Sequence, residues 1–364
     1  MFQLQKRRLG RTDLEVSVIG FGGIPIIGAS KEYAHKMLTY AYELGINYFD
    51  TARAYGDSEE KFGEALKLVR DKVILATKTY QKKSDTVLFE LKQSLRNLKT
   101  DYIDIVLVQR VDDERAFRAI MSEDGALRAL KEAKKKEDVG FIGISSHNPY
   151  IFSKVIQSGQ FDIALVPLSL ITREFTEEAL ELAEKLDVGV VVMKPFGGTD
   201  FRFVQSEWNI WNLPVGEFHQ IFGKDKEKAG RALRFVLAHS IDTVIPGFSS
   251  IEDVESAASV GEGFQGLTEK EKKDYSFGKM PQEPFCRECG ACLPCNRGLN
   301  IPFILRLYKY HTFYSIRIWS REVYQRLSTK VDDCTNCGQC ESKCPYQLPI
   351  VNMLRAAHKA IPSC

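Results

Sequence analysis

The feature that most constrains the fold is an alternation of short β-branched runs with helix-length amphipathic stretches, which recurs eight times. After an opening ribbon, the predicted strands are 18–21, 46–50, 73–78, 103–109, 139–145, 163–166, 189–194 and 243–247. Helical patterns lie between them at 33–44, 59–69, 85–98, 125–136, 177–186 and 226–239. Strict alternation predicts a parallel sheet, either open and doubly wound or closed into a barrel. Eight repeats favour the barrel, so we expect an α/β fold, a (β/α)8 TIM barrel.

All nine cysteines lie after this region, in the last 79 residues. A first string has the spacing C-x2-C-x2-C-x2-C and consists of Cys286, Cys289, Cys292 and Cys295. A second string has the spacing C-x2-C-x2-C-x3-C-P, which is the run of bacterial ferredoxins, and contains Cys334, Cys337, Cys340 and Cys344. A disulfide framework would not leave the first 285 residues without cysteine, so we expect metal ligands in a reducing compartment.

The spacing also predicts how the cysteines divide between clusters. In two-cluster ferredoxins the fourth cysteine of each run binds the other cluster. One cluster would then take Cys286, Cys289, Cys292 and Cys344, and the other would take Cys334, Cys337, Cys340 and Cys295. Zinc is the alternative, but zinc sites prefer two C-x2-C pairs separated by a longer loop. We expect two 4Fe-4S clusters, with one 4Fe-4S cluster as the fallback because the first string is less regular.

The predicted domains are a barrel over 1–262, a Gly- and Pro-containing linker over 263–285, and a small, mostly helical, ferredoxin-like iron-sulfur domain over 286–364. This last domain is basic, with 11 Lys and Arg against 5 Asp and Glu, as suits anionic clusters. Its segment 303–324 mixes aromatic and basic residues. Such a segment could be a membrane-surface helix, but Pro302 in a first-turn position favours helices that pack between the clusters.

Polar residues follow three neighbouring strands at the ends where a barrel carries its chemistry. The second strand ends at Asp50, with Tyr55 in the following loop, and the next two end at Lys78 and Gln109. A nearby ammonium favours the phenolate form of a tyrosine, so we expect Lys78 to lower the pKa of Tyr55. Such a tyrosine suits protonation of a carbonyl oxygen while a hydride reaches the carbon.

Residues 9–260 resemble the aldo-keto reductase family, and with the cysteine tail the chain resembles the iron-sulfur branch of that family. The resemblance lies in the stretches Leu9–Thr12, Phe49–Gly56, Ser58-Glu59, Ala76–Lys78 and Asp101–Asp104. It implies an NAD(P)H-dependent oxidoreductase that reduces a carbonyl or an activated double bond, with Tyr55 as general acid and a tetrad of Asp50, Tyr55, Lys78 and Gln109. The family usually has histidine where this chain has Gln109, and an amide can donate a hydrogen bond but cannot become a cation.

The resemblance also implies where NADPH or NADH would bind. The residues implied are Gly23 under the cofactor, Ser145 and Ser146 at the carboxamide, Lys194, Pro195, Phe196 and Gly197 at the pyrophosphate, and Gly247 and Ser249 at the adenosine phosphate. Asp253 falls where the family has a basic residue for a 2′-phosphate. An acidic residue repels a phosphate and can accept from a 2′-hydroxyl, which favours NADH.

Composition limits the remaining possibilities. With 50 basic against 48 acidic residues the chain shows no case for nucleic acid, and we expect no membrane span and a cytoplasmic location. The expected partners are a small-molecule carbonyl substrate and an electron-transfer protein. The aromatic stretch 200–225 is either a lid over the barrel mouth or packing against outer helices. The alternative function is an iron-sulfur electron-transfer or assembly module with a ligand-binding but catalytically weakened barrel.

Overall fold

The computed structural model describes residues 4–169, 178–196, 226–274, 286, 290–312 and 317–361. These residues form two compact units, one within 4–274 and the other within 286–361, and each is described by itself. The stretch 200–225, for which we considered a lid, lies outside the described residues.

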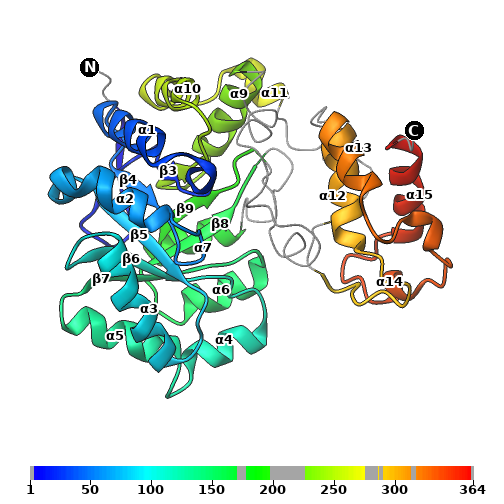
Figure 1. Cartoon of the computed structure of the whole chain (residues 1–364), viewed down its shortest axis with the longest axis horizontal. Helices are drawn as coiled ribbons and strands as arrows, with labels where there is room; N and C mark the ends of the chain where they lie inside the picture. The colour runs from blue at the N-terminus through cyan, green and yellow to red at the C-terminus, as the bar shows by residue number, and fades with distance from the viewer. Residues whose placement is uncertain are drawn as a thin grey trace. The chain divides into compact units, whose positions relative to one another are not determined.

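Eight parallel strands form the centre of the first unit, in sequence order around the sheet (Figure 1). They are β3 (Phe21–Gly22), β4 (Tyr48–Asp50), β5 (Ile74–Thr79), β6 (Ile103–Val108), β7 (Val139–Ser145), β8 (Ile163–Pro167), β9 (Gly189–Met193) and β10 (Thr243–Ile245). Parallel bridges from Ile19 to Val244 and from Gly22 to Gly247 join the first strand to the last. The predicted (β/α)8 barrel is confirmed.

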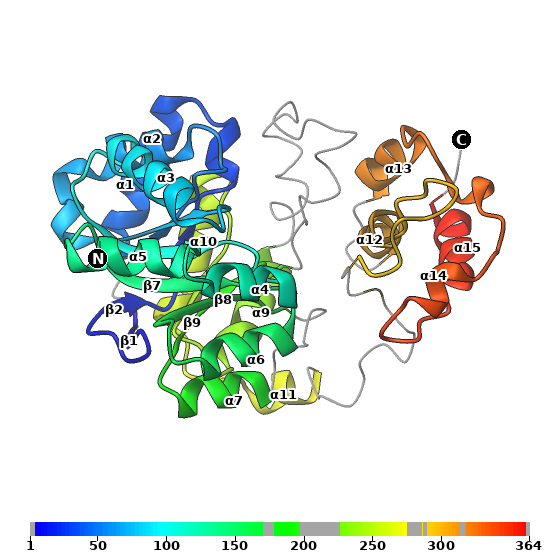
Figure 2. The ribbon, with the colours of Figure 1, turned by 90° about the horizontal axis from the view of Figure 1, so that it is seen from below.

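Helices surround this sheet, as Figure 2 shows. They are α1 (Lys31–Glu43), α2 (Ser58–Leu66), α3 (Ser84–Asn97), α4 (Glu114–Met121), α5 (Ala126–Lys135), α6 (Pro149–Gln157), α7 (Glu178–Lys185), α9 (Lys226–Leu237), α10 (Ile251–Glu262) and α11 (Glu269–Asp274). Helix α1 shows the common pattern: the Ser30 side chain caps its first turn, and a stripe of apolar side chains is buried, namely Ala34, Met37, Leu38 and Ala41.

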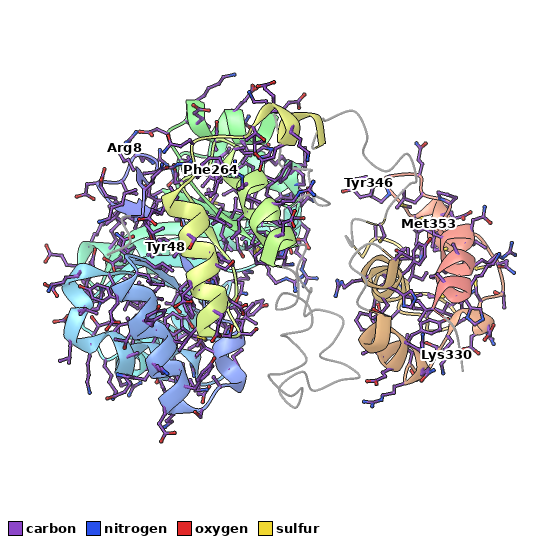
Figure 3. The ribbon with its side chains drawn as sticks, turned by 90° about the horizontal axis from the view of Figure 1, so that it is seen from above. Arg8, Tyr48, Phe264, Lys330, Tyr346 and Met353 are labelled. Atoms are coloured by element: carbon purple, nitrogen blue, oxygen red, sulfur yellow. The ribbon has the colours of Figure 1, made fainter. Side chains whose placement is uncertain are left out.

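A second, smaller core fills the inside of the barrel. Because side chains alternate along a strand, every second residue points inward. Tyr48, Ile74, Ile105 and Leu107 belong to this inner core, whereas their neighbours Phe49, Leu75 and Val106 pack outward against the helices. Tyr48 can be found in Figure 3. The residue two positions after each inward-pointing apolar side chain therefore also points inward. This alternation determines where the candidate catalytic side chains lie.

A hairpin fills the end of the barrel where the strands begin. Its strands are β1 (Lys6–Arg8) and β2 (Glu15–Ser17), and Leu9 and Val16 belong to the inner core. Gly10 in the turn has a φ of +50°, and a Cβ there would lie 2.0 Å from the backbone nitrogen of Gly189. Only glycine allows the hairpin to approach β9 this closely.

Residues 263–274, at the start of the predicted linker, contact the barrel. Phe264 is buried in the outer core, and Arg234 Nε of α9 lies 2.5 Å from Glu271 Oε1 of α11. Residues 275–285 lie outside the described residues. The predicted domain boundaries remain predictions.

The second unit is mostly helical and has its own core. Its helices are α12 (Ile301–Thr312), α13 (Arg317–Gln325), α14 (Gln339–Ser342) and α15 (Ile350–Ala360), and α12 contacts both α13 and α15. Lys330 and Met353 mark this unit in Figure 3. Ile304, Leu307 and Leu354 are fully or almost fully buried, each contributing about 1.5–3 kcal/mol. Among the described residues, no helix is long and apolar enough to cross a membrane.

Candidate active site and cluster-binding cysteines

Three of the predicted catalytic residues lie at the carboxyl ends of neighbouring strands. Asp50, Lys78 and Gln109 each follow an inward-pointing residue of the strand by two positions, so their side chains continue the inner face of the barrel. All three are at least nine-tenths buried. The same alternation that places apolar side chains inside the barrel brings these polar side chains together at the carboxyl ends of the strands.

Lys78 and Asp50 form a buried ion pair. Lys78 Nζ lies 2.5 Å from Asp50 Oδ1 and donates to the Thr51 carbonyl oxygen at 2.8 Å. Burial lowers the pKa of Lys78 and raises the pKa of Asp50, and the attraction between the two charges opposes both shifts. The other carboxylate oxygen, Asp50 Oδ2, is buried with no hydrogen-bond partner among the described residues.

Tyr55 lies against this pair. Lys78 Nζ is 5.1 Å from the centre of the Tyr55 ring, and the Gln109 side chain lies close enough to the phenol to act on its pKa, which it lowers. The pKa of Tyr55 is nevertheless raised well above its usual value, first by burial and then by the charge of Asp50. Our expectation that Lys78 lowers this pKa is therefore wrong. The reason is that burial of the phenol disfavours its charged form, and that Asp50 at contact distance compensates the charge of Lys78.

Gln109 is fixed from both sides. Its backbone N–H donates to the Thr79 carbonyl at 2.8 Å, and its own carbonyl accepts from Lys82 Nζ at 2.6 Å. Its side-chain oxygen is buried with no partner among the described residues. The amide therefore has one group for Tyr55 and another that remains available to a ligand.

Sequence reasoning did not assign a role to Glu59, which holds strand β5 in place beside Lys78. Its side chain is fully buried, accepts from Thr77 Oγ1 at 2.7 Å and pairs with Arg53 Nη1 at 3.1 Å. Thr77 precedes Lys78 on β5, so Glu59 fixes the strand beside the lysine. The Ser58-Glu59 pair within the family motif was the available signal.

The residues predicted at the nicotinamide end also lie at strand ends. Gly23 donates its N–H to the Asp50 carbonyl at 2.7 Å, and a Cβ there would lie 2.8 Å from the Phe62 ring, so the tetrad region needs glycine at this position. Ser145 Oγ accepts from the Arg110 N–H at 2.9 Å. Ser146 Oγ donates to the Val111 carbonyl at 2.8 Å. Both serines brace the β6 loop, and their assignment to the carboxamide stays a prediction.

The residues predicted at the phosphate end lie after β9 and β10. Pro195 is buried and Phe196 packs against the outer core, whereas Gly197 lies outside the described residues. Gly247 forms the bridge to Gly22, which closes the barrel. The buried Ser249 Oγ has no partner in the described part of the chain, as fits a ligand-binding hydroxyl.

Asp253 caps the N-terminus of α10. Its Oδ2 accepts the backbone N–H groups of Ser249 and Ser250, both at 3.1 Å, and Ser250 Oγ accepts the Asp253 N–H in return. This is a capping box, in which the protein's own carboxylate occupies the position where a helix N-terminus would otherwise attract an anion.

A polar cluster that sequence reasoning missed lies after β6, β7 and β9. Asp112 accepts from the His147 backbone at 2.7 Å and lies 3.2 Å from His147 Nδ1. His147 Nε2 is 3.1 Å from Lys194 Nζ, and Arg110 Nε is 3.5 Å from Asp112 Oδ2. Burial alone would raise the pKa of Asp112, but the hydrogen bonds and charge of His147 hold it well below its usual range. The sequence does not reveal this cluster, because the partners of His147 come from other strand ends.

In the second unit, cysteines from both strings line one pocket. They are Cys292, Cys295, Cys334, Cys337 and Cys340. Four of these are the set that the spacing predicts for a single cluster. Asn296 lies beside them, with Nδ2 3.7 Å from Cys337 Sγ. Hydrogen bonds lower the pKa of Cys337, the first of them from the Gln339 backbone, and this favours the thiolate form that binds metals.

The donor set around this pocket fits a cluster. Thiolates bind iron-sulfur clusters through several separate irons, so the cysteines surround a volume. Within the described ranges, no three Cys, His, Asp or Glu side chains are grouped to hold one metal ion. For the other predicted cluster, Cys286, Cys292 and Cys344 lie in or against the core of this unit, and Cys289 lies outside the described residues.

Comparisons with known families agree with this division of the chain. The sequence model of the "Aldo/keto reductase family" matches residues 18–276, and that of a "4Fe-4S dicluster domain" matches residues 285–349.

Among curated proteins, the chain is similar to the uncharacterized oxidoreductase YqkF of Bacillus subtilis, at 33% identity over 74% of this chain and 95% of that protein. It is also similar to L-galactose dehydrogenase of Arabidopsis thaliana, at 29% identity over 70% of this chain and 87% of that protein. Among solved structures, the holo form of aldo-keto reductase AKR11C1 from Bacillus halodurans matches with a TM-score of 0.60 and 29% identity, covering 75% of this chain and 96% of that one.

Proposed function

Because the chain belongs to the aldo/keto reductase family and carries a 4Fe-4S dicluster domain after its reductase part, we propose that it is an NAD(P)H-dependent carbonyl reductase with Tyr55 as general acid. The observation that carries the proposal is the convergence of four side chains at three neighbouring strand ends. Lys78 pairs with Asp50 and lies against the Tyr55 ring, and the Gln109 side chain lies beside the phenol.

The geometry supports a specific division of labour. When bound, NAD(P)H supplies a hydride to the carbonyl carbon. Negative charge then develops on the carbonyl oxygen, and the Tyr55 hydroxyl gives that oxygen its proton. The raised pKa of Tyr55 keeps the phenol protonated at neutral pH, as an acid must be. The Gln109 amide favours the resulting phenolate, while the Lys78–Asp50 pair lies against the Tyr55 ring and holds it in place.

NADH suits the adenosine end better than NADPH. Asp253 places a carboxylate at the N-terminus of α10, and its oxygen accepts two backbone N–H groups that could otherwise bind a 2′-phosphate. A 2′-phosphate at the same place would be repelled by the Asp253 carboxylate. The two backbone N–H groups there would also have an acceptor already. We therefore propose NADH as the preferred cofactor, with Ser249 as the free hydroxyl for the nucleotide.

The cysteines of the second unit would hold two 4Fe-4S clusters, one of them in the pocket lined by Cys295, Cys334, Cys337 and Cys340. Bound clusters transfer single electrons, whereas a hydride carries two. We propose that they exchange electrons with a partner protein, apart from the hydride step in the barrel.

Replacing Tyr55 by Phe tests the assignment. The full chain, purified without oxygen, should lose carbonyl-dependent NADH oxidation by about 100-fold or more, the usual contribution of a positioned acid. Its iron content and its visible cluster absorption should be unchanged. Tyr102→Phe, which changes a partly exposed tyrosine directly before β6, is the matched control and should keep full turnover. Full turnover in the Tyr55→Phe protein would refute the role of Tyr55.

The second candidate is an electron-transfer or assembly module whose barrel binds a ligand but has lost efficient catalysis. Gln109 favours it, because an amide at this position cannot act as a cationic acid. The same Tyr55→Phe variant distinguishes the two, because an electron carrier would keep its whole activity.

A further inference from the structure

Five side chains that the proposed hydride step does not use lie together at the carboxyl ends of the strands. Their centre is Asp112, which holds His147, while His147 in turn contacts Lys194. Arg110 pairs with Asp112 from the same loop. Lys82 reaches the Gln109 carbonyl from the loop after β5, and the charges of Asp112 and Arg110 both act on it. Side chains from the ends of β5, β6, β7 and β9 thus meet beside the tetrad.

The backbone at two of these residues is unusual. Five non-glycine residues of the described barrel have a positive φ, and three of them, Lys99, Glu137 and Asp187, follow the ends of helices, where this conformation is common. The other two are Arg110, with a φ of +59°, and Lys194, with a φ of +60°, and both follow strands. A strained backbone that holds a side chain at a strand end is typical of functional sites.

The charges of the cluster point to the chemistry of its ligand. Lys82, Arg110 and Lys194 are cations, whereas Asp112 is the carboxylate at their centre. The nearby Asp113 caps α4 by accepting the Ala116 N–H at 2.7 Å, and its charge also acts on Lys82. The imidazole of His147 lies between Asp112 and Lys194, with Nδ1 facing the carboxylate. Three cations from separate strand ends are suited to an oxyanion.

The environment of Lys82 also favours an oxyanion as the ligand. Its pKa is lowered to about 8, first by burial and also by the charge of Arg110, although Asp112 and Asp113 oppose this shift. A buried ammonium in this position is stabilised by an incoming negative charge. Its contact with the Gln109 carbonyl places it next to a residue that lies beside Tyr55.

We propose that Lys82, Arg110 and Lys194, arranged around Asp112 and His147, bind an oxyanion carried by the substrate, so that the preferred substrates are carbonyl compounds with a carboxylate or phosphate group. The inference rests on the proposed reductase function, because it assigns the substrate class of that site. The same oxyanion could belong to the nucleotide, since Lys194 begins the segment assigned to its pyrophosphate. The position of Lys82 beside Gln109 favours the substrate.

The first experiment compares an acid with its ester. Pyruvate and methyl pyruvate serve as probes for the full chain and for its Lys82→Met variant. We expect the KM for pyruvate to rise about 10- to 100-fold in the variant, the size of one charge-assisted hydrogen bond, while the KM for methyl pyruvate stays the same. Lys82→Arg should restore most of the loss. Lys92→Met, which removes an exposed lysine of α3, is the control and should change neither value.

The outcomes separate the sources of the oxyanion. An equal loss for acid and ester would overturn the proposal, because it would indicate a merely structural role. A weaker NADH affinity with an unchanged ratio of acid to ester would also overturn it, because the oxyanion would then be the cofactor's.

A second experiment does not depend on turnover. Malonate has carboxylates but no reducible carbonyl, so calorimetry without nicotinamide cofactor measures anion binding alone. Binding to the unmodified chain that is lost in Lys82→Met supports the site even if neither pyruvate nor its ester is reduced. If methyl pyruvate is reduced but malonate does not bind, the reductase proposal stands and the oxyanion site is rejected.

Discussion

The buried ion pair between Lys78 and Asp50 links the chemistry of the site to the stability of the barrel. Neither charge would be stable in this position alone, because transfer of an ion from water to a protein interior is unfavourable by several kcal/mol. The pair therefore keeps both groups charged beside Tyr55. Its value lies in positioning, since such pairs contribute little net stability compared with apolar side chains of the same size.

Replacing Asp50 by Asn tests this coupling. The variant leaves Lys78 buried without a counter-charge, so we expect a loss of about 3–5 kcal/mol in the free energy of unfolding and a sharp fall in carbonyl reduction. Thermal unfolding followed by calorimetry measures the first. The double variant Asp50→Asn with Lys78→Met should recover much of the stability but none of the activity. An Asp50→Asn protein as stable as the original would contradict the role of the pair.

The raised pKa of Tyr55 predicts the pH dependence of catalysis. Reduction requires the protonated phenol, so its rate should stay constant as pH rises and fall only when the phenol ionises, above its ordinary pKa of about 10. The reverse oxidation requires the phenolate and should rise over the same range. Profiles of kcat for an uncharged carbonyl measure this, and reduction should stay constant throughout the range from pH 6 to about 10. A decline in reduction centred near pH 7 would argue against Tyr55 as the acid.

At the scale of elements, two local periodicities explain why much of the fold was predictable. A period of about 3.6 residues defines the helices, and a period of two defines the strands. The period of two also places Asp50, Lys78 and Gln109 on the inner face of the barrel. Each of the eight predicted runs overlaps a strand of the barrel, with ends that differ by a few residues. The short helices α4 and α6 were not predicted, although the caps Asp113 and Asn148 mark where they begin.

The remaining parts of the site could not be predicted, because they depend on contacts between loops. Asp112, His147 and Lys194 follow three different strands, and no periodicity relates them. The direction of the Tyr55 pKa shift also needed the structure. From the sequence the lysine and its aspartate partner were evident, but the burial that raises the pKa of Tyr55 was not.

Helix α10 offers a test of how an element selects a cofactor. Replacing Asp253 by Arg removes the carboxylate from the helix N-terminus and adds a cation, so we expect the preference to shift toward NADPH by about tenfold or more in KM. Loss of the cap should cost about 1 kcal/mol of stability. Asp253→Asn, which keeps an acceptor but no charge, should shift the ratio less. Steady-state kinetics with both cofactors provide the readout, and an unchanged ratio would refute this role.

At the scale of the whole molecule, the barrel and the cysteine unit have separate hydrophobic cores. Each unit can therefore lose its function without loss of the other. This separation is the physical reason for proposing that hydride transfer and electron transfer are distinct activities of one chain.

Replacing Cys337 by Ala tests this separation. The variant should bind about four irons per chain where the original binds about eight, because one ligand of the second cluster is missing. Carbonyl reduction in the barrel should persist. Cys364→Ala, outside both cysteine strings, should keep the full iron content. Iron and sulfide assays on protein prepared without oxygen measure both. A Cys337→Ala protein with undiminished iron would exclude this residue as a ligand.

The hairpin fills one end of the barrel, with Leu9 and Val16 among the inner side chains, and the reacting groups lie at the opposite rim, where the strands end. We expect both reactants to enter at that rim. Two reactants that share one entrance cannot bind independently, since the one that binds at the mouth blocks the one that lies deeper. Turnover should then follow a compulsory order, with the dinucleotide entering first and departing last.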